Sequence, residues 1–221
     1  MPKTALITGA SKGIGQAIAE TFQTNNIKVL TPSHKELDLS SNGSVDSYIA
    51  KLKTPVDILV NNAGINPLGE IEQITDANIE EVMRVNLISP LRLTRGLIRS
   101  MKANKYGKIL NISSLWSIVS KPGRLVYAMS KSGLNAMTRS LAVELAPYNI
   151  LVNSVAPGFV NTELTKKNLT QKEIEKIKEK IPLSRLAEPE EIAELAYFLC
   201  SDKNTYVTGQ IILIDGGYTC L

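Results

Sequence analysis

The 221-residue sequence has few of the features that mark secreted, membrane or nucleic-acid-binding proteins. It contains only two cysteines, Cys200 in a helical pattern and Cys220 near the C-terminus, so we expect free thiols rather than a disulfide. No apolar run approaches the roughly 18 residues that a membrane-spanning helix requires. No signal peptide is recognisable either, so we expect a cytoplasmic protein without a membrane partner.

Neither positive nor negative charge is in large excess in this sequence. The 25 basic and 21 acidic residues leave a net charge of +4, and no basic segment alternates with aromatic residues. Nucleic acid is therefore not an expected partner, and no metal site is expected. A slightly basic surface still suits an anionic ligand or an acidic carrier protein. Hydrophobic residues make up 43% of a chain of one domain's length, which is enough for a proper core.

Short apolar segments alternate with amphipathic ones along the whole sequence. Such alternation indicates an α/β protein, a doubly wound parallel sheet with helices on both faces. No repeat or linker interrupts it, so we predict one domain over residues 1–221. Strands are predicted at 3–8, 27–31, 56–60, 108–113, 151–155 and 210–214, and helices at 14–22, 45–52, 79–101 and 127–145, with two more before the final strand.

A glycine-rich turn joins the first predicted strand to the first predicted helix. Glycines there let the backbone approach a pyrophosphate, whose charge is met by N–H groups at the helix start. The order strand, turn, helix is the context that a Rossmann-type dinucleotide site requires. The turn reads Thr8-Gly9-Ala10-Ser11-Lys12-Gly13-Ile14-Gly15.

Tyr127 and Lys131 are spaced one helical turn apart, and Ser114 precedes them at the end of a predicted strand. An ammonium near a phenol favours the phenolate and lowers the pKa of the phenol. A serine hydroxyl holds a carbonyl oxygen against that phenol. The set suits protonation of an oxygen while a hydride reaches carbon. A tyrosine–lysine pair alone is also an ordinary contact on a helix surface, so its meaning depends on the other motifs.

Taken together, these motifs resemble the short-chain dehydrogenase/reductase family, and within it the 3-oxoacyl-acyl-carrier-protein reductase type. The resemblance extends from Lys3 to about Tyr218. It rests on the glycine turn, Asn61-Asn62-Ala63-Gly64, Asn86, Ser114, Tyr127-x-x-x-Lys131, Asn153-Ser154-Val155-Ala156-Pro157-Gly158, Pro182-Leu183-Ser184-Arg185, and the segment from Thr208-Gly209-Gln210 to Asp215-Gly216-Gly217.

The resemblance implies a role for each catalytic residue. Tyr127 is the general acid for carbonyl reduction or the base for alcohol oxidation. Lys131 lowers the pKa of Tyr127 and binds the nicotinamide ribose, and Ser114 orients the substrate oxygen. Asn86 holds a water that links Lys131 to solvent.

The resemblance also implies a cofactor site. The glycine turn binds the pyrophosphate, and Asp38 and Leu39 bind the adenine. The segment after the third predicted strand lines the adenosine ribose side, and the segment after the fifth flanks the nicotinamide. The implied cofactor residues are Gly9, Ser11, Lys12, Gly13, Ile14, Gly15, Ser33, Asp38, Leu39, Asn61, Ala63, Gly64, Tyr127, Lys131, Pro157, Gly158, Val160 and Thr162.

The sequence departs from the family after its second strand. The family has a helix and a further strand there, but only about six residues separate Thr31 from Leu37, and a parallel crossover needs about a dozen or more. We therefore predict that the helix is missing and that residues 36–39 form only a stub at the sheet edge. The fold is then a Rossmann-type sheet of roughly six to seven strands.

Cofactor choice depends on the same segment. NAD-preferring members have an acidic residue at the end of the second strand. Here Thr31, Pro32 and Ser33 occupy that place. Lys12, Ser33, His34 and Lys35 are candidates for contact with a 2′-phosphate, which favours NADP over NAD. The alternative is that Lys12 and His34 are solvated surface residues that do not contact the cofactor.

Two loops near the predicted active site point toward the substrate. Trp116 and Arg124 lie between the catalytic serine and tyrosine, and each is a candidate substrate contact or a packing or surface residue. The second loop, about residues 159–189, contains a predicted helix at 171–180 with a capping box of Thr170 and Glu173. Its charged face is either solvated or part of a lid that closes over substrate.

Excess apolar residues on the two long helices suggest self-association. The family pairs these helices across a two-fold axis, so we expect a homotetramer or, failing that, a homodimer. The apolar run 211–214 is also expected to be paired or covered. The helix positions concerned are Leu87, Leu91, Leu134, Met137 and Leu141.

The expected function is NADPH-dependent reduction of a ketone, a 3-oxoacyl thioester or similar carbonyl, with substrates linked to an acyl carrier included. One alternative is a dehydrogenase or reductase of a sugar, polyol or other small carbonyl. Another is a non-catalytic dinucleotide-binding regulator, which the intact set of Asn86, Ser114, Tyr127 and Lys131 disfavours.

Overall fold

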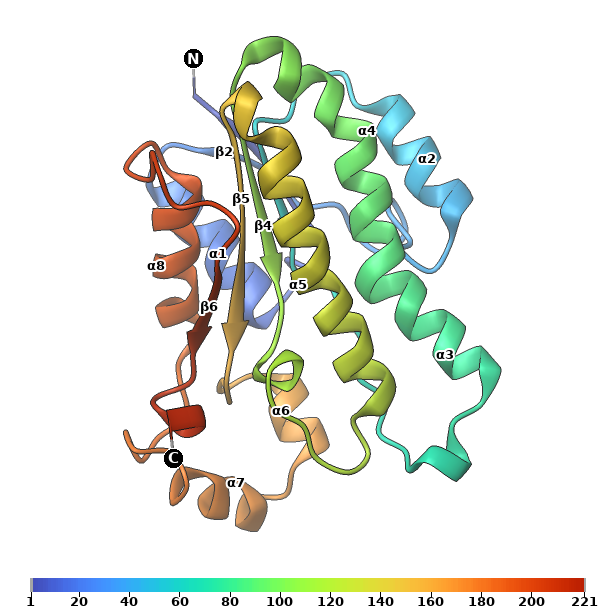
Figure 1. Ribbon diagram of the computed structural model, residues 1–221, viewed down its shortest axis with the longest axis vertical. Coiled ribbons are helices and arrows are strands. Elements are labelled where there is room, and N and C mark those ends of the chain that lie inside the picture. Colours follow the sequence, from blue (N-terminus) through green and yellow to red (C-terminus); the bar gives the residue numbers. More distant parts are fainter. Residues whose placement is uncertain (1, 221) are drawn as a thin grey trace.

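The computed structural model describes residues 2–220, whose strands form a single parallel sheet of six (Figure 1). The strand order is β2-β1-β3-β4-β5-β6, and every neighbouring pair is parallel. The predicted doubly wound sheet is thus confirmed. The strands are β1 (Thr4–Ile7), β2 (Lys28–Leu30), β3 (Ile58–Asn61), β4 (Gly107–Ile112), β5 (Ile150–Pro157) and β6 (Ile211–Ile214).

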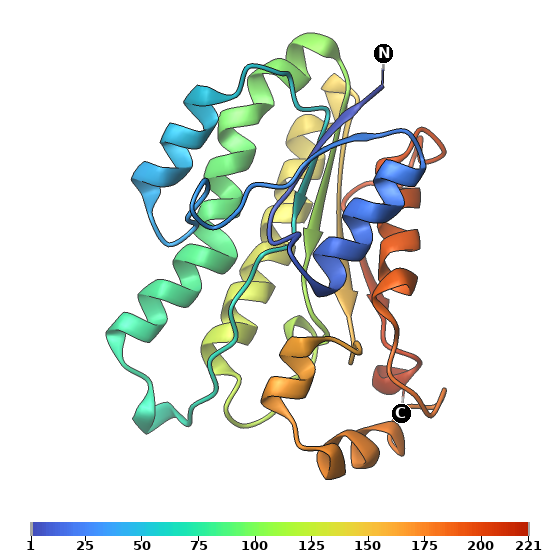
Figure 2. The same ribbon diagram turned by 180° about the vertical axis from the view of Figure 1, so that it is seen from behind.

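Helices cover both faces of this sheet. Helices α2, α4 and α5 lie on one face, and α1 and α8 lie on the other, as the front and back views show (Figures 1 and 2). Helices α6 and α7 lie beyond the carboxyl ends of the strands. The helix bounds are α1 (Gly13–Thr24), α2 (Asn42–Lys51), α3 (Asp76–Met83), α4 (Ser89–Asn104), α5 (Leu125–Leu145), α6 (Glu163–Asn168), α7 (Gln171–Lys178) and α8 (Pro189–Cys200).

Successive side chains along each strand point to opposite faces of the sheet, so the hydrophobic core has two parts, one on each face. In β1, Ala5 and Ile7 pack with Phe22 of α1 and with the apolar face of α8. Leu6, between them, packs on the opposite face with residues of α2 and α4 such as Leu93. Successive side chains of a strand point to opposite faces, so a sheet covered on both sides needs strands that are apolar throughout.

The predicted helix 79–101 lies within a continuous helical stretch, which a π-helical turn divides into two α-helices. Helix α3 ends at Met83, a π-helical turn spans Arg84–Ile88, and α4 begins at Ser89. Pro90 gives the physical reason, since proline has no N–H to donate to the carbonyl of Asn86 four residues earlier. Asn86 therefore lies at an irregular turn, and such π-turns are frequent at functional sites.

The predicted shortening between the second and third strands is confirmed, but the stub is not a strand. Residues 31–41 contain no helix and make no pairing with the sheet, so β2 remains its edge. Ser33 and Glu36 close a local turn instead, and the chain then enters α2, where the Ser41 hydroxyl accepts from the Ser44 N–H. The crossover from β2 to β3 uses α2 alone.

Three helices, rather than the predicted two, lie between β5 and β6, because the loop after β5 also folds into the short helix α6. The capping box of Thr170 and Glu173 is confirmed at the start of α7. Ile174, Ile181 and Leu186 form a small core of their own in this region, against which Phe159 and Tyr218 pack.

The remaining expectations concern surfaces and thiols. Cys200 is buried and Cys220 exposed, and both are free. Leu134 is buried within the protomer, so it is not available for self-association as predicted, whereas Leu91 is exposed. Within residues 2–220, no helix is long and apolar enough to cross a membrane. The same residues contain no group of side chains suited to hold a metal ion.

Candidate active site

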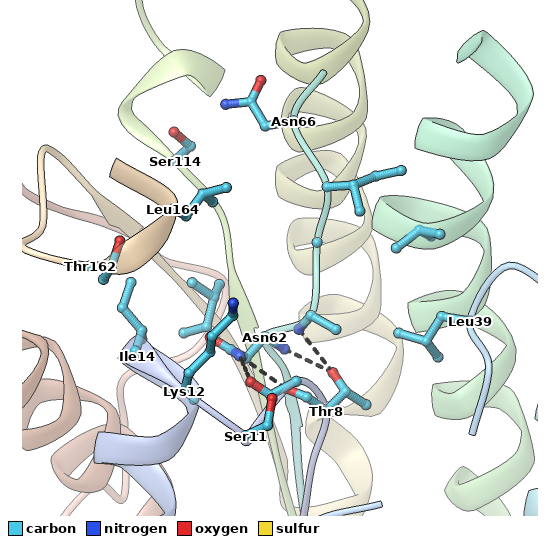
Figure 3. Close-up of a pocket in the computed structure, with 18 of the residues that line it drawn as sticks. Thr8, Ser11, Lys12, Ile14, Leu39, Asn62, Asn66, Ser114, Thr162 and Leu164 are labelled. Atoms are coloured by element: carbon cyan, nitrogen blue, oxygen red, sulfur yellow. Dashed lines mark hydrogen bonds between the residues drawn. The ribbon is translucent and has the colours of Figure 1, made fainter. Parts of the chain in front are cut away.

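A cavity of about 820 Å³ opens at the carboxyl ends of the strands. The glycine turn, the segment 31–40, and the loops that follow β3, β4 and β5 line it. Carboxyl ends of parallel strands are where doubly wound sheets bind their ligands. Figure 3 shows the lower part of the cavity at the glycine turn, with Thr162 and Leu164 reaching in from the loop and helix that follow β5.

The glycine turn is held against the end of β3 by Asn62. Its amide donates to the carbonyl oxygens of Thr8 and Gly9, both at 3.0 Å (Figure 3). The Thr8 hydroxyl accepts from the N–H groups of Asn62 and Ala63, both at 3.1 Å. A Cβ on Gly15 would lie 2.3 Å from the Asn62 amide nitrogen, so this contact requires glycine.

This turn fits the pyrophosphate of a dinucleotide. Gly9 has a φ of +67°, and a Cβ there would lie 2.9 Å from the Cα of Ala63. Helix α1 begins at Gly13, and its first three residues line the cavity; it has no acidic residue in its first turn. Backbone N–H groups at a helix start, without a side chain in the way, form an anion-binding cradle.

Polar groups at the adenosine end of the cavity already have partners. The Ser33 N–H and hydroxyl both donate to the Glu36 carboxylate at 2.8 Å, and these bonds lower the pKa of Glu36. Asp38 accepts from the N–H and hydroxyl of Ser40, which lower the pKa of its carboxyl. Ser33, His34, Asp38 and Leu39 line the cavity, whereas Glu36 does not.

Ser114, Tyr127 and Lys131 meet at the other end of the cavity. Helix α5 carries Tyr127 and Lys131 on one face, and the Lys131 Nζ lies 5.7 Å from the centre of the Tyr127 ring. The same ammonium donates to the carbonyl oxygen of Ile112 at 2.7 Å, at the end of β4. Ser114 follows two residues later and accepts from the Trp116 N–H at 3.2 Å.

The pKa of Tyr127 does not shift in the expected direction. Burial raises it, and the Ser114 hydroxyl and the Arg124 guanidinium oppose this shift without reversing it. Burial also lowers the pKa of Lys131 to about 8. The reason is that removal from water disfavours the charged form of each group, so the phenol keeps its proton and the ammonium releases one more readily.

Asn86 lies behind this site and does not line the cavity. Its side chain accepts from the Ile65 N–H and donates to the Ile65 carbonyl, both at 2.9 Å. It also donates to the Ser130 hydroxyl at 3.1 Å. Asn86 thereby joins the loop after β3 to α5, and a Cβ on Gly64 would lie 3.2 Å from its amide oxygen and 3.4 Å from the Lys131 Nζ.

Asn61 is the other proposed site residue that the cavity excludes. It is buried in β3, where its amide donates to Asn111 of β4 at 2.9 Å. All other proposed catalytic, cofactor and substrate residues line the cavity. The sequence interpretation missed several lining residues, of which Thr8 and Asn62 sit inside motifs that it quoted. The missed residues include Thr8, Asn62, Ile65, Asn66, Val85, Phe159, Leu164, Leu169 and Asn168.

The substrate end of the cavity is aromatic and basic. Trp116 packs edge-on against Phe159 with ring centres 5.9 Å apart, and Phe159 packs in the same way against Tyr218. The Arg124 guanidinium lies 5.6 Å from the centre of the Trp116 ring, and the Lys121 Nζ lies 5.5 Å from it. Both Trp116 and Arg124 are buried.

Comparison with known proteins identifies the family. A family model described as enoyl-(acyl carrier protein) reductase matches residues 31–219. The 3-oxoacyl-acyl-carrier-protein reductase FabG of Rickettsia felis is 40% identical over 232 residues, which cover 97% of this chain and 96% of the relative. The chain belongs to the short-chain dehydrogenase/reductase family. It is therefore an NAD(P)-dependent oxidoreductase that acts on CH–OH and C=O groups.

Solved short-chain dehydrogenase/reductase structures agree with this fold. One is a putative NAD(P)-dependent gluconate 5-dehydrogenase from Beutenbergia cavernae with bound NADP, which has 31% identity and a TM-score of 0.91 over 99% of this chain and 97% of that one. Another is a 4-hydroxyisoleucine dehydrogenase complexed with NADH, which has 30% identity and a TM-score of 0.93 over 99% of both chains. Relatives in this family thus use either nicotinamide cofactor on different substrates.

Proposed function

We propose that this protein is an NADPH-dependent reductase that converts a ketone, a 3-oxoacyl thioester or similar carbonyl, into a secondary alcohol. The observation that carries the proposal is the convergence of Ser114, Tyr127 and Lys131 on one cavity with the glycine turn. The similarity to FabG supports the thioester as a substrate. When bound, the reduced nicotinamide supplies the hydride.

Each residue of the site has a defined task in this reaction. Ser114 and Tyr127 donate hydrogen bonds to the carbonyl oxygen, where negative charge develops as the hydride arrives. Tyr127 then passes its proton to that oxygen. Lys131 binds the ribose of the cofactor and keeps positive charge near the phenol while its proton is lost. The Asn86 side chain fixes the loop that follows β3. Its backbone carbonyl oxygen receives no hydrogen bond from Pro90, which has no N–H, and this oxygen holds the water that returns a proton to Lys131.

The acid–base state of the site favours the reductive direction. Burial raises the pKa of Tyr127, so the phenol is protonated at neutral pH, as a proton donor must be. Alcohol oxidation would need the phenolate first. An ideal catalytic acid has its proton in place at the working pH, and this site meets that requirement for reduction.

NADPH is the proposed cofactor because the second strand ends without an acidic side chain in the cavity. Ser33 and His34 line the cavity, and Lys12 lines it from the glycine turn. Glu36, the nearest carboxylate in sequence, is held by Ser33 outside it. A 2′-phosphate bound here would compete with Glu36 for the Ser33 donors. The ribose hydroxyl of NADH would find no carboxylate acceptor at the end of the second strand, and the Asp38 carboxylate farther along already accepts from Ser40.

Steady-state kinetics test this proposal. We expect the purified protein to oxidise NADPH in the presence of an acetoacetyl thioester, with a kcat/KM at least tenfold above that with NADH. A clear preference for NADH would contradict the cofactor assignment. No oxidation with any of a panel of ketones, despite NADPH binding, would contradict the enzymatic function itself.

A second candidate is a dehydrogenase of a sugar, polyol or other small carbonyl on the same site. Two solved relatives, the putative gluconate 5-dehydrogenase and the 4-hydroxyisoleucine dehydrogenase, support it. The buried Arg124 supports it further, because a long acyl chain offers a guanidinium nothing to bind. Including gluconate and small oxo acids in the same panel separates the two candidates.

We also propose that the protein acts as a homotetramer or homodimer in the cytoplasm. Leu91 of α4 and Met129 and Val143 of α5 are exposed apolar residues on the helices that the family pairs across a two-fold axis. Helices α4 and α5 lie side by side on the same face (Figure 1). A single protomer mass in light scattering at micromolar concentration would contradict the oligomer.

A further inference from the structure

Arg124 is a buried cation without a counter-ion among the described residues. Only 5% of its surface is exposed. Its Nε is enclosed and has no hydrogen-bond partner, and none of the ion pairs within residues 2–220 includes its guanidinium. Its contact on one side is the ring face of Trp116. The side chain lines the catalytic cavity together with Ser114 and Tyr127.

Burial of the Arg124 guanidinium without a counter-ion costs free energy unless a ligand supplies hydrogen-bond acceptors. A guanidinium stays protonated in proteins, so burial cannot be relieved by loss of a proton. Buried charges are normally paired or fully hydrogen-bonded, and an unpaired donor carries the whole desolvation penalty. Stacking on Trp116 supplies a cation–π contact but leaves the in-plane donors of the fork unused.

The surrounding electrostatics leave the positive charge uncompensated. Burial, and next to it the charge of Arg124, lowers the pKa of Lys121, which lies over the same indole ring. Glu173 of α7 acts in the opposite direction on Lys121, but it accepts from the N–H and hydroxyl of Thr170. The substrate end of the cavity is therefore an electropositive place.

We propose that Arg124 determines specificity by binding a carboxylate of the substrate, close to the carbonyl that is reduced. This inference rests on the second candidate function, reduction or oxidation of a small carbonyl or alcohol, and narrows its substrate class to small oxo acids and the corresponding hydroxy acids. A guanidinium matches a carboxylate with two parallel hydrogen bonds, so the same contact also orients the neighbouring carbonyl toward Tyr127.

The position of Arg124 sets how far this carboxylate lies from the reacting carbon. Arg124 precedes Tyr127 by three residues at the start of α5, and its charge acts directly on the Tyr127 hydroxyl. A carboxylate bound there belongs within a few bonds of the carbonyl. The phosphate of an acyl-carrier arm lies at the far end of a long chain and does not meet this requirement.

Asn66 adds a second polar group to this region. Its amide oxygen is buried without a partner, and the side chain lines the same cavity as Ser114 (Figure 3). An acceptor left open in this way suits a hydroxyl or ammonium donor on the substrate. The carboxylate of an oxo acid satisfies Arg124, and an oxo acid or hydroxy acid that also carries a hydroxyl or ammonium group satisfies Asn66 as well, whereas an alkyl chain would leave both without hydrogen bonds.

The kinetic test compares acetoacetate with its methyl ester, which share a carbon skeleton and differ in the negative charge. We expect the wild-type kcat/KM to be at least thirtyfold higher with acetoacetate. Arg124→Gln should remove that preference, and Arg124→Lys should restore part of it. Any effect of Arg124 on the pKa of Tyr127 is common to both substrates, so the ratio of the two kcat/KM values isolates the carboxylate contact.

Lys121→Gln is the matched control, since it removes a neighbouring cation that does not line the cavity. We expect it to leave the acetoacetate-to-ester ratio within threefold of wild type. A wild-type preference for the ester, or an equal loss on both substrates in Arg124→Gln, would overturn the proposal. So would a loss of the ratio in Lys121→Gln as large as in Arg124→Gln.

A binding measurement separates this proposal from the proposed function. Trp116 is the single tryptophan of the chain and lies against Arg124, so its fluorescence reports an anion bound there. We expect saturable titration by acetoacetate in the presence of NADP, none by the ester, and none in Arg124→Gln. If wild type reduces no ketone of the panel, the proposed function fails, yet saturation lost in Arg124→Gln still supports the site. No saturation, or saturation that survives in Arg124→Gln, overturns it.

Discussion

Lys12 and Glu163 form an ion pair across the mouth of the cavity, with 2.9 Å between Nζ and Oε2. Lys12 belongs to the glycine turn, and Glu163 begins α6 in the predicted lid. Thr162 lies beside this pair, and its methyl group would be 3.3 Å from a Cβ placed on Gly13. The turn proposed to hold the cofactor and the segment predicted to close over substrate are therefore in direct contact.

We expect the Glu163 carboxylate and the 2′-phosphate of NADPH to compete for the Lys12 ammonium. Both side chains are mostly exposed, so the pair itself contributes little to stability. Glu163→Gln frees Lys12 for the 2′-phosphate, and we expect the Kd for NADPH to fall about threefold to tenfold, in line with roughly 1 kcal/mol. Lys12→Gln should raise it by a similar factor. Neither variant should change the Kd for NADH.

Fluorescence titration with both cofactors at low and high salt checks this, and Lys166→Gln, another cation of α6, is the control. A change of equal size for NADH and NADPH would mean that Lys12 does not meet the 2′-phosphate.

Gly15→Ala tests the junction between the glycine turn and β3. The added Cβ would collide with the Asn62 amide at 2.3 Å and the Gly9 carbonyl at 2.4 Å. We expect cofactor binding to be lost and the Tm to fall. Gly43→Ala in α2 is the control, because its Cβ would meet nothing closer than 3.9 Å. Alanine there should be neutral or stabilise the helix by about 0.5–1 kcal/mol. Equal effects of the two variants on NADPH affinity would contradict this account.

Lys131→Met should stabilise the fold while it removes activity. Burial lowers the pKa of Lys131 from 10.5 to about 8, so the folded state disfavours the ammonium. The destabilisation is fully present below pH 8 and is relieved as the pH rises toward 10.5, where the unfolded lysine still carries its proton. We expect a gain of roughly 1 to 3 kcal/mol at pH 7, after the lost bond to Ile112 is allowed for, and little at pH 10.

Urea unfolding at the two pH values checks this gain. Lys108→Met is the control, since Lys108 is another buried lysine whose pKa is lowered, but it lies outside the cavity and donates to the Asn204 carbonyl. It should leave cofactor affinity and catalysis near wild type. A destabilised Lys131→Met at pH 7 would show that the ammonium is not disfavoured by burial.

The rate of carbonyl reduction should fall as the pH rises through about 8. The pKa of Lys131 lies there, and loss of its proton removes the charge that stabilises the developing phenolate. Tyr127 keeps its proton over this range because burial raises its pKa, so the decline reports the lysine. Lys131→Arg should move the decline to higher pH. A profile that is flat from pH 6 to 10 would argue against a role for the Lys131 charge.

Motif spacing predicted the site better than helix periodicity predicted the helices. The positions of the strands and of the glycine turn follow from short-range rules, because apolar runs mark buried strands and glycines mark close backbone approach. The sequence pattern did not predict the π-helical turn between α3 and α4, because hydrophobic periodicity continues through Arg84–Ile88. Pro90 is the signal that marks it, since it deprives the Asn86 carbonyl of its donor.

Solvation and side-chain partners were harder to predict. The spacing of Tyr127 and Lys131 suggested that the lysine acidifies the phenol, but how deeply both are buried depends on the packed loops around them. Asn61 and Asn62 are neighbours in one motif, but Asn61 ends β3 and bonds Asn111 of the neighbouring strand, whereas Asn62 follows the strand and lines the cavity. Tertiary packing determines these outcomes.

The most direct test of the proposed chemistry is Tyr127→Phe, assayed for both NADPH binding and ketone reduction. The variant lacks the hydroxyl oxygen alone, so we expect NADPH to bind within threefold of the wild-type Kd while kcat falls at least a thousandfold. Retained reduction at more than a tenth of the wild-type kcat would show that another group protonates the carbonyl oxygen and would contradict the account.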